Sequence, residues 1–212
     1  MDLFTNTHPL NINILPNVIL LKGFALSNEV ALLDDLQTVI TQAPPRHMMT
    51  KMGFAMSAAM TNCGNLGWVS DRKGYRYDAC DPLNNQPWPT MPASFKQLAN
   101  LAAHEAGFKD FQPDACLINR YKVGASMGLH QDKNELDYSQ PIVSVSLGIP
   151  AVFQFGGKLR NDKTIKIPLT HGDVVVWGNE SRQNFHGILP LKTNQHEPLG
   201  AYRFNLTFRR AG

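Results

Sequence analysis

The sequence predicts a mainly β protein with flanking helices, an α+β fold built on an antiparallel sandwich or jelly roll. Three observations predict this class. The second half of the 212-residue chain contains six short runs rich in Val, Ile and Phe, separated by Gly, Pro and Asn turns. No helical pattern interrupts these runs, which argues against alternating strands and helices. Two helical patterns lie in the first half, and we expect them to brace one sheet of the same domain.

The first half begins with a short apolar strand candidate at residues 17–21 (NVILL). Ser27 or Asn28 can then cap a helix, because a side-chain oxygen at this position accepts a hydrogen bond from a free backbone N–H. Apolar residues recur at helical spacing through positions 30–40, and the proline pair 44–45 ends the pattern.

The remaining elements follow from periodicity and turn residues. A second helix is expected from Ser94 to Gly107, with its apolar residues on one face. Residues 47–88, between the two helices, are rich in Met, Gly and aromatic residues and show no clear periodicity. The six predicted strands are residues 115–121, 142–149, 151–155, 164–169, 173–177 and 202–209.

Composition excludes several classes of protein. With 43% hydrophobic and 17% charged residues, the chain is typical of a folded globular domain, which excludes disorder, collagen and coiled coil. No stretch is a credible membrane span, and the first residues lack the pattern of a secretory signal. We therefore expect a cytoplasmic monomer without membrane contact, in which Cys63, Cys80 and Cys116 are reduced.

Charge is unevenly distributed along the chain. Residues 1–45 carry a net charge of −3 and residues 46–76 a net charge of +4. A second basic cluster lies between Lys158 and Lys166. Local positive charge of this kind suits a polyanion such as nucleic acid, and the alternative is a solvated loop surface.

The pattern His130-Gln-Asp132 is the sharpest chemical motif. Side chains two positions apart lie on the same side of an extended segment, so both residues can bind one metal ion. His186 is the natural third ligand. Two His and one carboxylate leave coordination positions open, as in non-heme Fe(II) oxygenases. The alternative is that each His has only a structural role.

The last predicted strand carries a polar face. Arg203, Asn205 and Arg209 alternate with apolar residues and so share one face of the strand. Two buried guanidiniums would require anions, and a small dicarboxylate would satisfy both. The alternative is that this face is solvated.

A rival motif occurs at residues 124–128 (GASMG), which match the nucleophile elbow of α/β-hydrolases around Ser126. Asp173 and His186 follow in the order of that triad. However, the elbow needs a helix directly after it, and no apolar helical face follows. We interpret the two glycines as turn residues.

Several of these motifs together resemble the AlkB family of Fe(II)- and 2-oxoglutarate-dependent dioxygenases. The resemblance lies in Asn119 and Tyr121, His130 and Asp132, His186, and the closing Arg203-x-Asn205-x-x-x-Arg209. It extends through residues 60–68 (MTNCGNLGW), 111–121 (FQPDACLINRY), 141–148 (PIVSVSLG), 153–157 (FQFGG) and 171–178 (HGDVVVWG).

The resemblance implies a single domain (1–212) that forms a double-stranded β-helix, or jelly roll. Residues 1–45 would be an N-terminal strand and helix extension, 46–90 a nucleotide-recognition lid, and 91–212 a helix plus the catalytic core. The implied Fe(II) ligands are His130, Asp132 and His186, and the implied 2-oxoglutarate contacts are Asn119, Tyr121, Arg203, Asn205 and Arg209. The implied substrate contacts are Met60, Trp68, Tyr75, Arg76, Tyr77, Asn134 and Arg160.

The implied activity is the oxidative demethylation of 1-methyladenine and 3-methylcytosine in single-stranded DNA. Dioxygen and 2-oxoglutarate would be consumed, and formaldehyde, succinate and CO2 released. Double-stranded DNA or RNA is a further substrate to consider. Alternatives are an oxygenase acting on RNA or protein, and a catalytically silent jelly roll that binds nucleic acid. Asn134 stands where the bacterial repair enzymes of this family carry Asp, so we expect a shifted base preference or rate.

Overall fold

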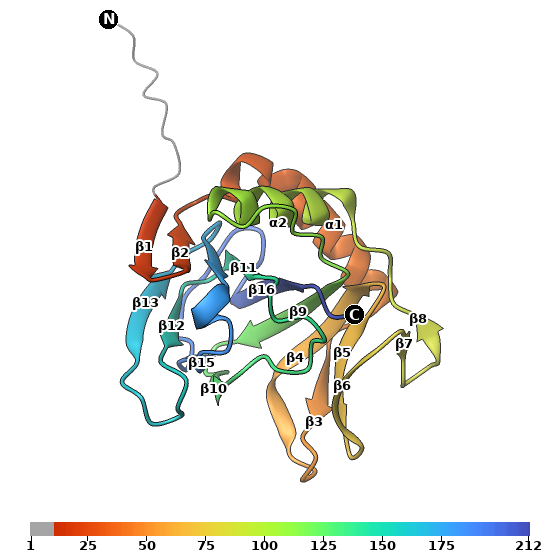
Figure 1. The fold of residues 1–212 in the computed structure, drawn as a ribbon. Helices are drawn as coiled ribbons and strands as arrows, with labels where there is room; N and C mark the ends of the chain where they lie inside the picture. Colours follow the sequence, from red (N-terminus) through yellow and green to blue (C-terminus); the bar gives the residue numbers. More distant parts are fainter. Residues whose placement is uncertain (1–10) are drawn as a thin grey trace, which may run out of the picture.

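The computed structural model describes residues 11–212, and residues 1–10, with the expected absence of a secretory signal there, lie outside this part. Two antiparallel sheets and two helices form three layers (Figure 1). The large sheet has the order β1-β2-β14-β11-β16-β9-β4-β3. Its strands are β1 (Asn11–Leu15), β2 (Val18–Leu21), β14 (Val174–Trp177), β11 (Ile142–Gly148), β16 (Tyr202–Arg209), β9 (Ala115–Lys122), β4 (Ala55–Gly64) and β3 (Arg46–Met49).

The small sheet has the order β10-β15-β12-β13. Its strands are β10 (Met127–His130), β15 (His186–Ile188), β12 (Ala151–Phe155) and β13 (Ile165–Leu169). Two hairpins form separate two-stranded sheets, namely β5 (Gly67–Asp71) with β6 (Gly74–Asp78), and β7 (Cys80–Asp81) with β8 (Gln86–Pro87). Two short 3-10 helices, η1 (Leu26–Asn28) and η2 (Asn179–Ser181), lie in connections.

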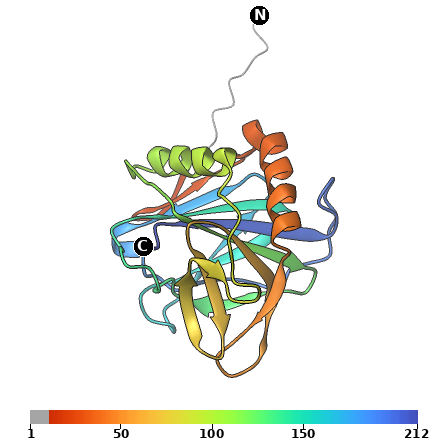
Figure 2. The same ribbon diagram turned by 90° about the vertical axis from the view of Figure 1, so that its right-hand side faces the viewer.

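The helices α1 (Glu29–Gln42) and α2 (Ala93–Glu105) cover one face of the large sheet (Figures 1 and 2). Both are expected from the sequence, and α2 ends at Glu105, two residues before Gly107, whose φ of 87° lies in the left-handed region that favours glycine. Within residues 11–212, no helix has the length and apolar character needed to cross a membrane.

Strict alternation divides the side chains of the central strands between two cores. The even-numbered residues of β16, such as Phe204 and Leu206, pack with Val143 and Val145 of β11 against the two helices. The odd-numbered residues of β16 and β9 face the small sheet, where Phe153 of β12 also packs. The functional side chains therefore lie between the two sheets.

The six strands predicted in the second half are confirmed to within about two residues. Residues 47–88, which lack periodicity, nevertheless form strands: β3 and β4 extend the large sheet beside β9, and β5–β6 forms a hairpin next to them. Tertiary pairing explains this, because β4 is buried along most of its length and cannot show an alternation of polar and apolar residues.

Candidate metal centre and active site

Pairing between two strands of the small sheet assembles the candidate metal ligands. His130 of β10 is directly opposite His186 of β15, and their ring centroids are 4.4 Å apart. Asp132 follows two residues after His130. Its Oδ1 lies 3.8 Å from Nε2 of His130, and its Oδ2 lies 3.7 Å from Nε2 of His186. The three ligand atoms all lie within 4.8 Å of one another, which is close enough to share one ion.

Backbone contacts fix the orientation of both imidazoles. Nδ1 of His130 lies 2.9 Å from the carbonyl oxygen of Gly128, and Nδ1 of His186 lies 3.0 Å from that of Asn184. A carbonyl accepts, so each neutral ring carries its proton on Nδ1 and directs the free lone pair of Nε2 toward Asp132. This is the tautomer that a histidine requires to bind a metal through Nε2.

Arg209 holds the carboxylate in place. Its Nε and Nη2 donate to Oδ2 of Asp132 at 3.0 and 2.7 Å. Burial is the largest single influence and by itself would raise the pKa of Asp132, but the Arg209 guanidinium and, after it, the two imidazoles together hold the pKa below its usual value. Asp132 is therefore ionised, as a metal ligand must be.

A cavity of about 390 Å³ opens above this centre. It contains all three candidate ligands and all five residues expected to contact 2-oxoglutarate. Met60, Trp68, Tyr75, Asn134 and Arg160 of the expected substrate contacts line it too. Figure 1 shows that the β5–β6 hairpin lies beside the strands that form the cavity.

The other two expected substrate contacts, Arg76 and Tyr77, do not line the cavity. Arg76 lies on the opposite face of β6 from its neighbours and forms ion pairs with Asp71 and Asp78. The hydroxyl of Tyr77 donates to Glu135 at 2.6 Å, just outside the cavity.

Arg203 is the group that most clearly calls for a ligand. It is 1% exposed, and it donates one hydrogen bond, from Nη2 to Ser146 at 2.9 Å. Its Nε and Nη1 have no partner, and no carboxylate within residues 11–212 lies within 4.0 Å of it. The neighbouring Oδ1 of Asn119 is also buried without a partner. A buried cation without an anion is costly, so these atoms suit a bound carboxylate.

The polar face of β16 is therefore buried, and the alternative of a solvated face is wrong. Arg203, Asn205 and Arg209 are all at most 8% exposed. Asn205 is already satisfied within the protein, because its Nδ2 donates to Ser144 at 2.8 Å and to the carbonyl oxygen of Val145 at 3.0 Å. The amide of Asn205 therefore mainly connects β16 to β11 and is less available to donate a hydrogen bond to a ligand.

Two buried charged residues near the centre have no signal in the sequence. Glu135 is 5% exposed and Arg182 is 2% exposed. Nη1 of Arg182 donates to the backbone carbonyl of Asp132 at 3.0 Å, and its Nε donates to that of Gln140 at 3.0 Å. These two bonds hold both ends of the loop that carries Asp132. The partners of both residues are distant in the sequence. No short sequence motif therefore marks either residue.

The hydrolase interpretation is wrong. Strand β10 begins at Met127, directly after Ser126, where the elbow would need a helix, and Ser126 does not line the cavity. Asp173 is 1% exposed and pairs with Lys22, so it does not approach His186.

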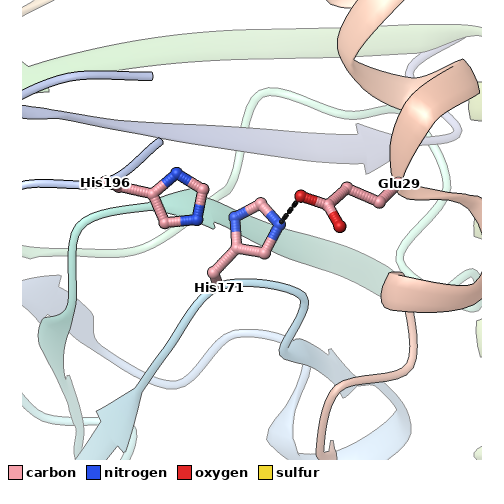
Figure 3. Close-up of side chains that lie close together, drawn as sticks. All are labelled: Glu29, His171 and His196. Carbon is pink, nitrogen blue, oxygen red and sulfur yellow. Dashed lines mark ion pairs between the residues drawn. The ribbon is translucent and has the colours of Figure 1, made fainter. Parts of the chain in front are cut away.

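Glu29, His171 and His196 form a second cluster of potential metal ligands within residues 11–212 (Figure 3). The backbone N–H of Gly148 donates to Nδ1 of His171 at 2.9 Å. The proton of this neutral imidazole is therefore on Nε2, which lies 3.0 Å from the Glu29 carboxylate. Because His171 has no lone pair left for an ion, we interpret this cluster as a structural contact that joins α1 to two loops.

Comparison with known proteins agrees with this geometry. Residues 17–209 match the family model described as the 2OG-Fe(II) oxygenase superfamily. A protein of Salmonella typhimurium named "Alpha-ketoglutarate-dependent dioxygenase AlkB" is 54% identical over 211 residues, which cover 100% of this chain and 98% of that protein. The chain belongs to the AlkB family of this superfamily.

Two further comparisons relate the AlkB-family protein to less similar proteins. "DNA N(6)-methyladenine demethylase ALKBH1A" of Arabidopsis thaliana is 31% identical over 194 residues, covering 86% of this chain and 55% of that protein. A solved structure described as "The structure of OsALKBH1" aligns with a TM-score of 0.81 at 26% identity, covering 95% of this chain and 100% of that one. The protein is thus a jelly-roll dioxygenase that uses Fe(II), 2-oxoglutarate and dioxygen.

The metal-free AlkB-family protein is expected to lose stability in mild acid. Burial, followed by the proximity of His130, lowers the pKa of His186 to about 4, whereas an unfolded histidine titrates near 6.5. At a pH between these two pKa values, position 186 binds a proton in the unfolded chain but not in the folded chain. From about pH 7.5 to about pH 5, this difference removes about 2 kcal/mol of the free energy of unfolding.

Urea unfolding in the presence of a chelator measures this effect. The variant His186→Asn keeps a polar side chain but cannot titrate, so its pH dependence should be shallower by about the same amount. If the free energy of unfolding depends on pH identically in both proteins, the destabilisation in acid does not come from the lowered pKa of His186.

Proposed function

We propose that this dioxygenase demethylates N-alkylated bases, namely 1-methyladenine and 3-methylcytosine, in single-stranded DNA. One observation carries the proposal: a cavity with the size of a small-molecule site joins the candidate metal ligands and two buried arginines to a rim of aromatic side chains. The name of the Arabidopsis relative also supports a methylated base as substrate. Double-stranded DNA and RNA are the alternative substrates, and the cytoplasmic location and monomeric state stay predictions.

The rim is built to receive a planar base. The rings of Trp68 and Tyr75 are stacked, with centroids 5.6 Å apart and planes inclined by 15°. Nε1 of Trp68 donates to Oδ1 of Asn134 at 3.2 Å, which fixes the plane of the indole. A base removed from the nucleic acid can stack on such a surface. Methylation of its Watson–Crick edge has already broken its pairing, so extrusion costs less.

The residues below the rim divide the remaining tasks. When bound, Fe(II) together with 2-oxoglutarate and dioxygen supplies the oxidation that turns an N-methyl group into an N-hydroxymethyl group. His130, Asp132 and His186 would hold the metal, while Arg203 and Arg209 would bind the two carboxylates of 2-oxoglutarate. The C–N bond of the hydroxymethyl product then breaks: its electron pair stays on the ring nitrogen, the hydroxyl group loses its proton, and the carbon leaves as formaldehyde.

Charge around the cavity supports a polyanionic substrate. Arg160 lines the cavity, donates from Nη1 to the carbonyl oxygen of Leu129 at 2.7 Å, and stacks on Phe185. Lys51, Arg72 and Lys73 lie exposed in the turns of the β3–β4 and β5–β6 hairpins. These positive charges can follow a phosphate backbone without reading its sequence.

The test is to incubate the protein with Fe(II), 2-oxoglutarate and a single-stranded oligonucleotide that contains one 1-methyladenine. We expect formaldehyde and succinate in equal amounts. Replacing Trp68 by alanine should raise the KM for the oligonucleotide by about 5- to 150-fold, because stacking on an aromatic side chain contributes about 1–3 kcal/mol per base. Tyr202→Ala, at an aromatic residue outside the cavity, is the matched control.

Other outcomes would redirect the proposal. Succinate without formaldehyde from the DNA would favour RNA or a protein as the substrate. No succinate with any nucleic acid would favour a protein as the substrate. Asn134→Asp, assayed on 1-methyladenine and 3-methylcytosine, tests the expected shift in base preference, which equal kinetics would exclude.

A further inference from the structure

A buried carboxylate connects the β5–β6 hairpin to the candidate cosubstrate site. Oε1 of Glu135 accepts a hydrogen bond from the Tyr77 hydroxyl at 2.6 Å and lies 3.4 Å from Nε of Arg209. Its Oε2 lies 3.2 Å from Nη2 of Arg182. Glu135 is therefore the point at which the hairpin, the arginine beside Asp132 and the arginine that holds the Asp132 loop all meet.

We propose that Glu135 is a positioning residue that couples nucleotide binding at the β5–β6 hairpin to 2-oxoglutarate binding at Arg209. The inference rests on the proposed function, since it takes the nucleotide to lie against this hairpin. Glu135 contacts neither ligand in the proposal. It acts through Tyr77 on one side and through Arg209 on the other.

The orientation of Arg209 shows how the coupling works. Asp132 and Glu135 occupy the edge of the guanidinium formed by Nε and Nη2. Within residues 11–212, Nη1 donates no hydrogen bond, and Arg209 lines the cavity. With one edge held by two carboxylates, the other edge is presented to a carboxylate in the cavity. Losing the Glu135 contact would let the guanidinium rotate about Asp132.

Tyr77 is the part of this connection that responds to the hairpin. It lies on β6 next to Tyr75 in alternation, so both side chains are on the same face of the hairpin. Tyr75 stacks on Trp68 at the cavity rim. Burial raises the pKa of Tyr77 well above its usual value, so its hydroxyl keeps the proton that it donates. A nucleotide that holds the rim in this position also holds Tyr77 against Glu135.

Arg182 holds the Glu135 carboxylate in a fixed position. It is 2% exposed, contacts Glu135, and donates to the Asp132 carbonyl oxygen. Its guanidinium also lies 5.5 Å from the centre of the Tyr138 ring. The carboxylate thus has one arginine that anchors it to the loop and a second, Arg209, that it orients.

Coupling between two ligands is reciprocal, so each should increase the affinity for the other. The experiment measures the Kd of 2-oxoglutarate for the Fe(II)-loaded protein without oxygen, from the charge-transfer absorption band, with and without a methylated single-stranded oligonucleotide. In the unmodified protein the oligonucleotide should lower this Kd by at least about fivefold.

Tyr77→Phe and Glu135→Gln each remove one link of the connection and keep the shape of the side chain. Each should reduce the effect of the oligonucleotide to less than about twofold, and the double variant should show no further loss, since both residues act in one chain. Tyr202→Phe and Glu180→Gln make the same chemical changes at exposed positions outside the cavity and should keep the full effect.

The outcomes separate the inference from the function on which it rests. If the unmodified protein binds 2-oxoglutarate but its Kd does not respond to the oligonucleotide, the coupling is overturned. Failure of the same oligonucleotide to bind, measured by fluorescence anisotropy, would overturn the proposed function as well. If the response is present and persists in Tyr77→Phe and Glu135→Gln, the role of Glu135 alone is overturned. A purely structural role would lower the unfolding temperature of these variants without removing the response.

Discussion

Replacing Asp132 by alanine is expected to abolish Fe(II) binding and turnover together. Asp132 supplies the one carboxylate among the three candidate ligands, and both histidines direct Nε2 toward it. A pair of neutral imidazoles gives an incomplete site, because the carboxylate provides both the third donor atom and the negative charge. Metal content after dialysis, measured by atomic absorption, should fall from about one iron per chain to background.

The fold is expected to survive this change well enough for the measurement. Arg209 loses its partner at Asp132 but keeps Glu135 at 3.4 Å, so the buried cation is not left without a carboxylate. Circular dichroism checks this point. Ser126→Ala is the matched control, because Ser126 lies outside the cavity, and it should retain both iron and turnover. An Asp132→Ala protein that still forms succinate would refute the metal centre.

Replacing Arg203 by alanine is expected to weaken 2-oxoglutarate binding by about 10- to 150-fold. The Nε and Nη1 atoms of Arg203 are buried without partners, so a carboxylate of the cosubstrate would be their partner. A hydrogen bond to a charged group contributes about 1.5–3 kcal/mol, which corresponds to this range of Kd. Titration of the Fe(II)-loaded protein with 2-oxoglutarate, followed by absorption, measures the change.

Two further variants separate binding from folding. Arg203→Lys keeps the charge but lacks the planar fork, so an intermediate Kd is expected. Arg120→Ala removes an arginine from the neighbouring strand on the opposite face, where it stacks on Tyr202, and should leave the Kd unchanged. Since Arg203 lacks a buried carboxylate partner, its loss should cost little stability in the absence of 2-oxoglutarate. An unchanged Kd in Arg203→Ala would remove this residue from the site.

Much of the second half of the fold could be predicted, because its strands alternate clearly and end at strong turn residues. The strand 202–209 is an example: its polar and apolar residues alternate in sequence, and the structure places them on opposite faces. Residues 47–88 could not be predicted. Strand β4 is buried on both faces, so Thr61 and Asn62 lie as deep as Ala58. Its partner β9 is more than fifty residues away and supplies the hydrogen bonds that its own sequence does not specify.

The sequence by itself determined which side chains share a strand face and which pair, His130 and Asp132, can reach one ion, because local backbone geometry imposes those relations. Only the tertiary structure decided that the face of Arg203 and Arg209 is buried, since burial depends on the second sheet that covers it. It also decided that Tyr77, Glu135 and Arg182 meet. These residues come from segments far apart in the chain, and buried charges find partners only when folding has removed water from around all of them.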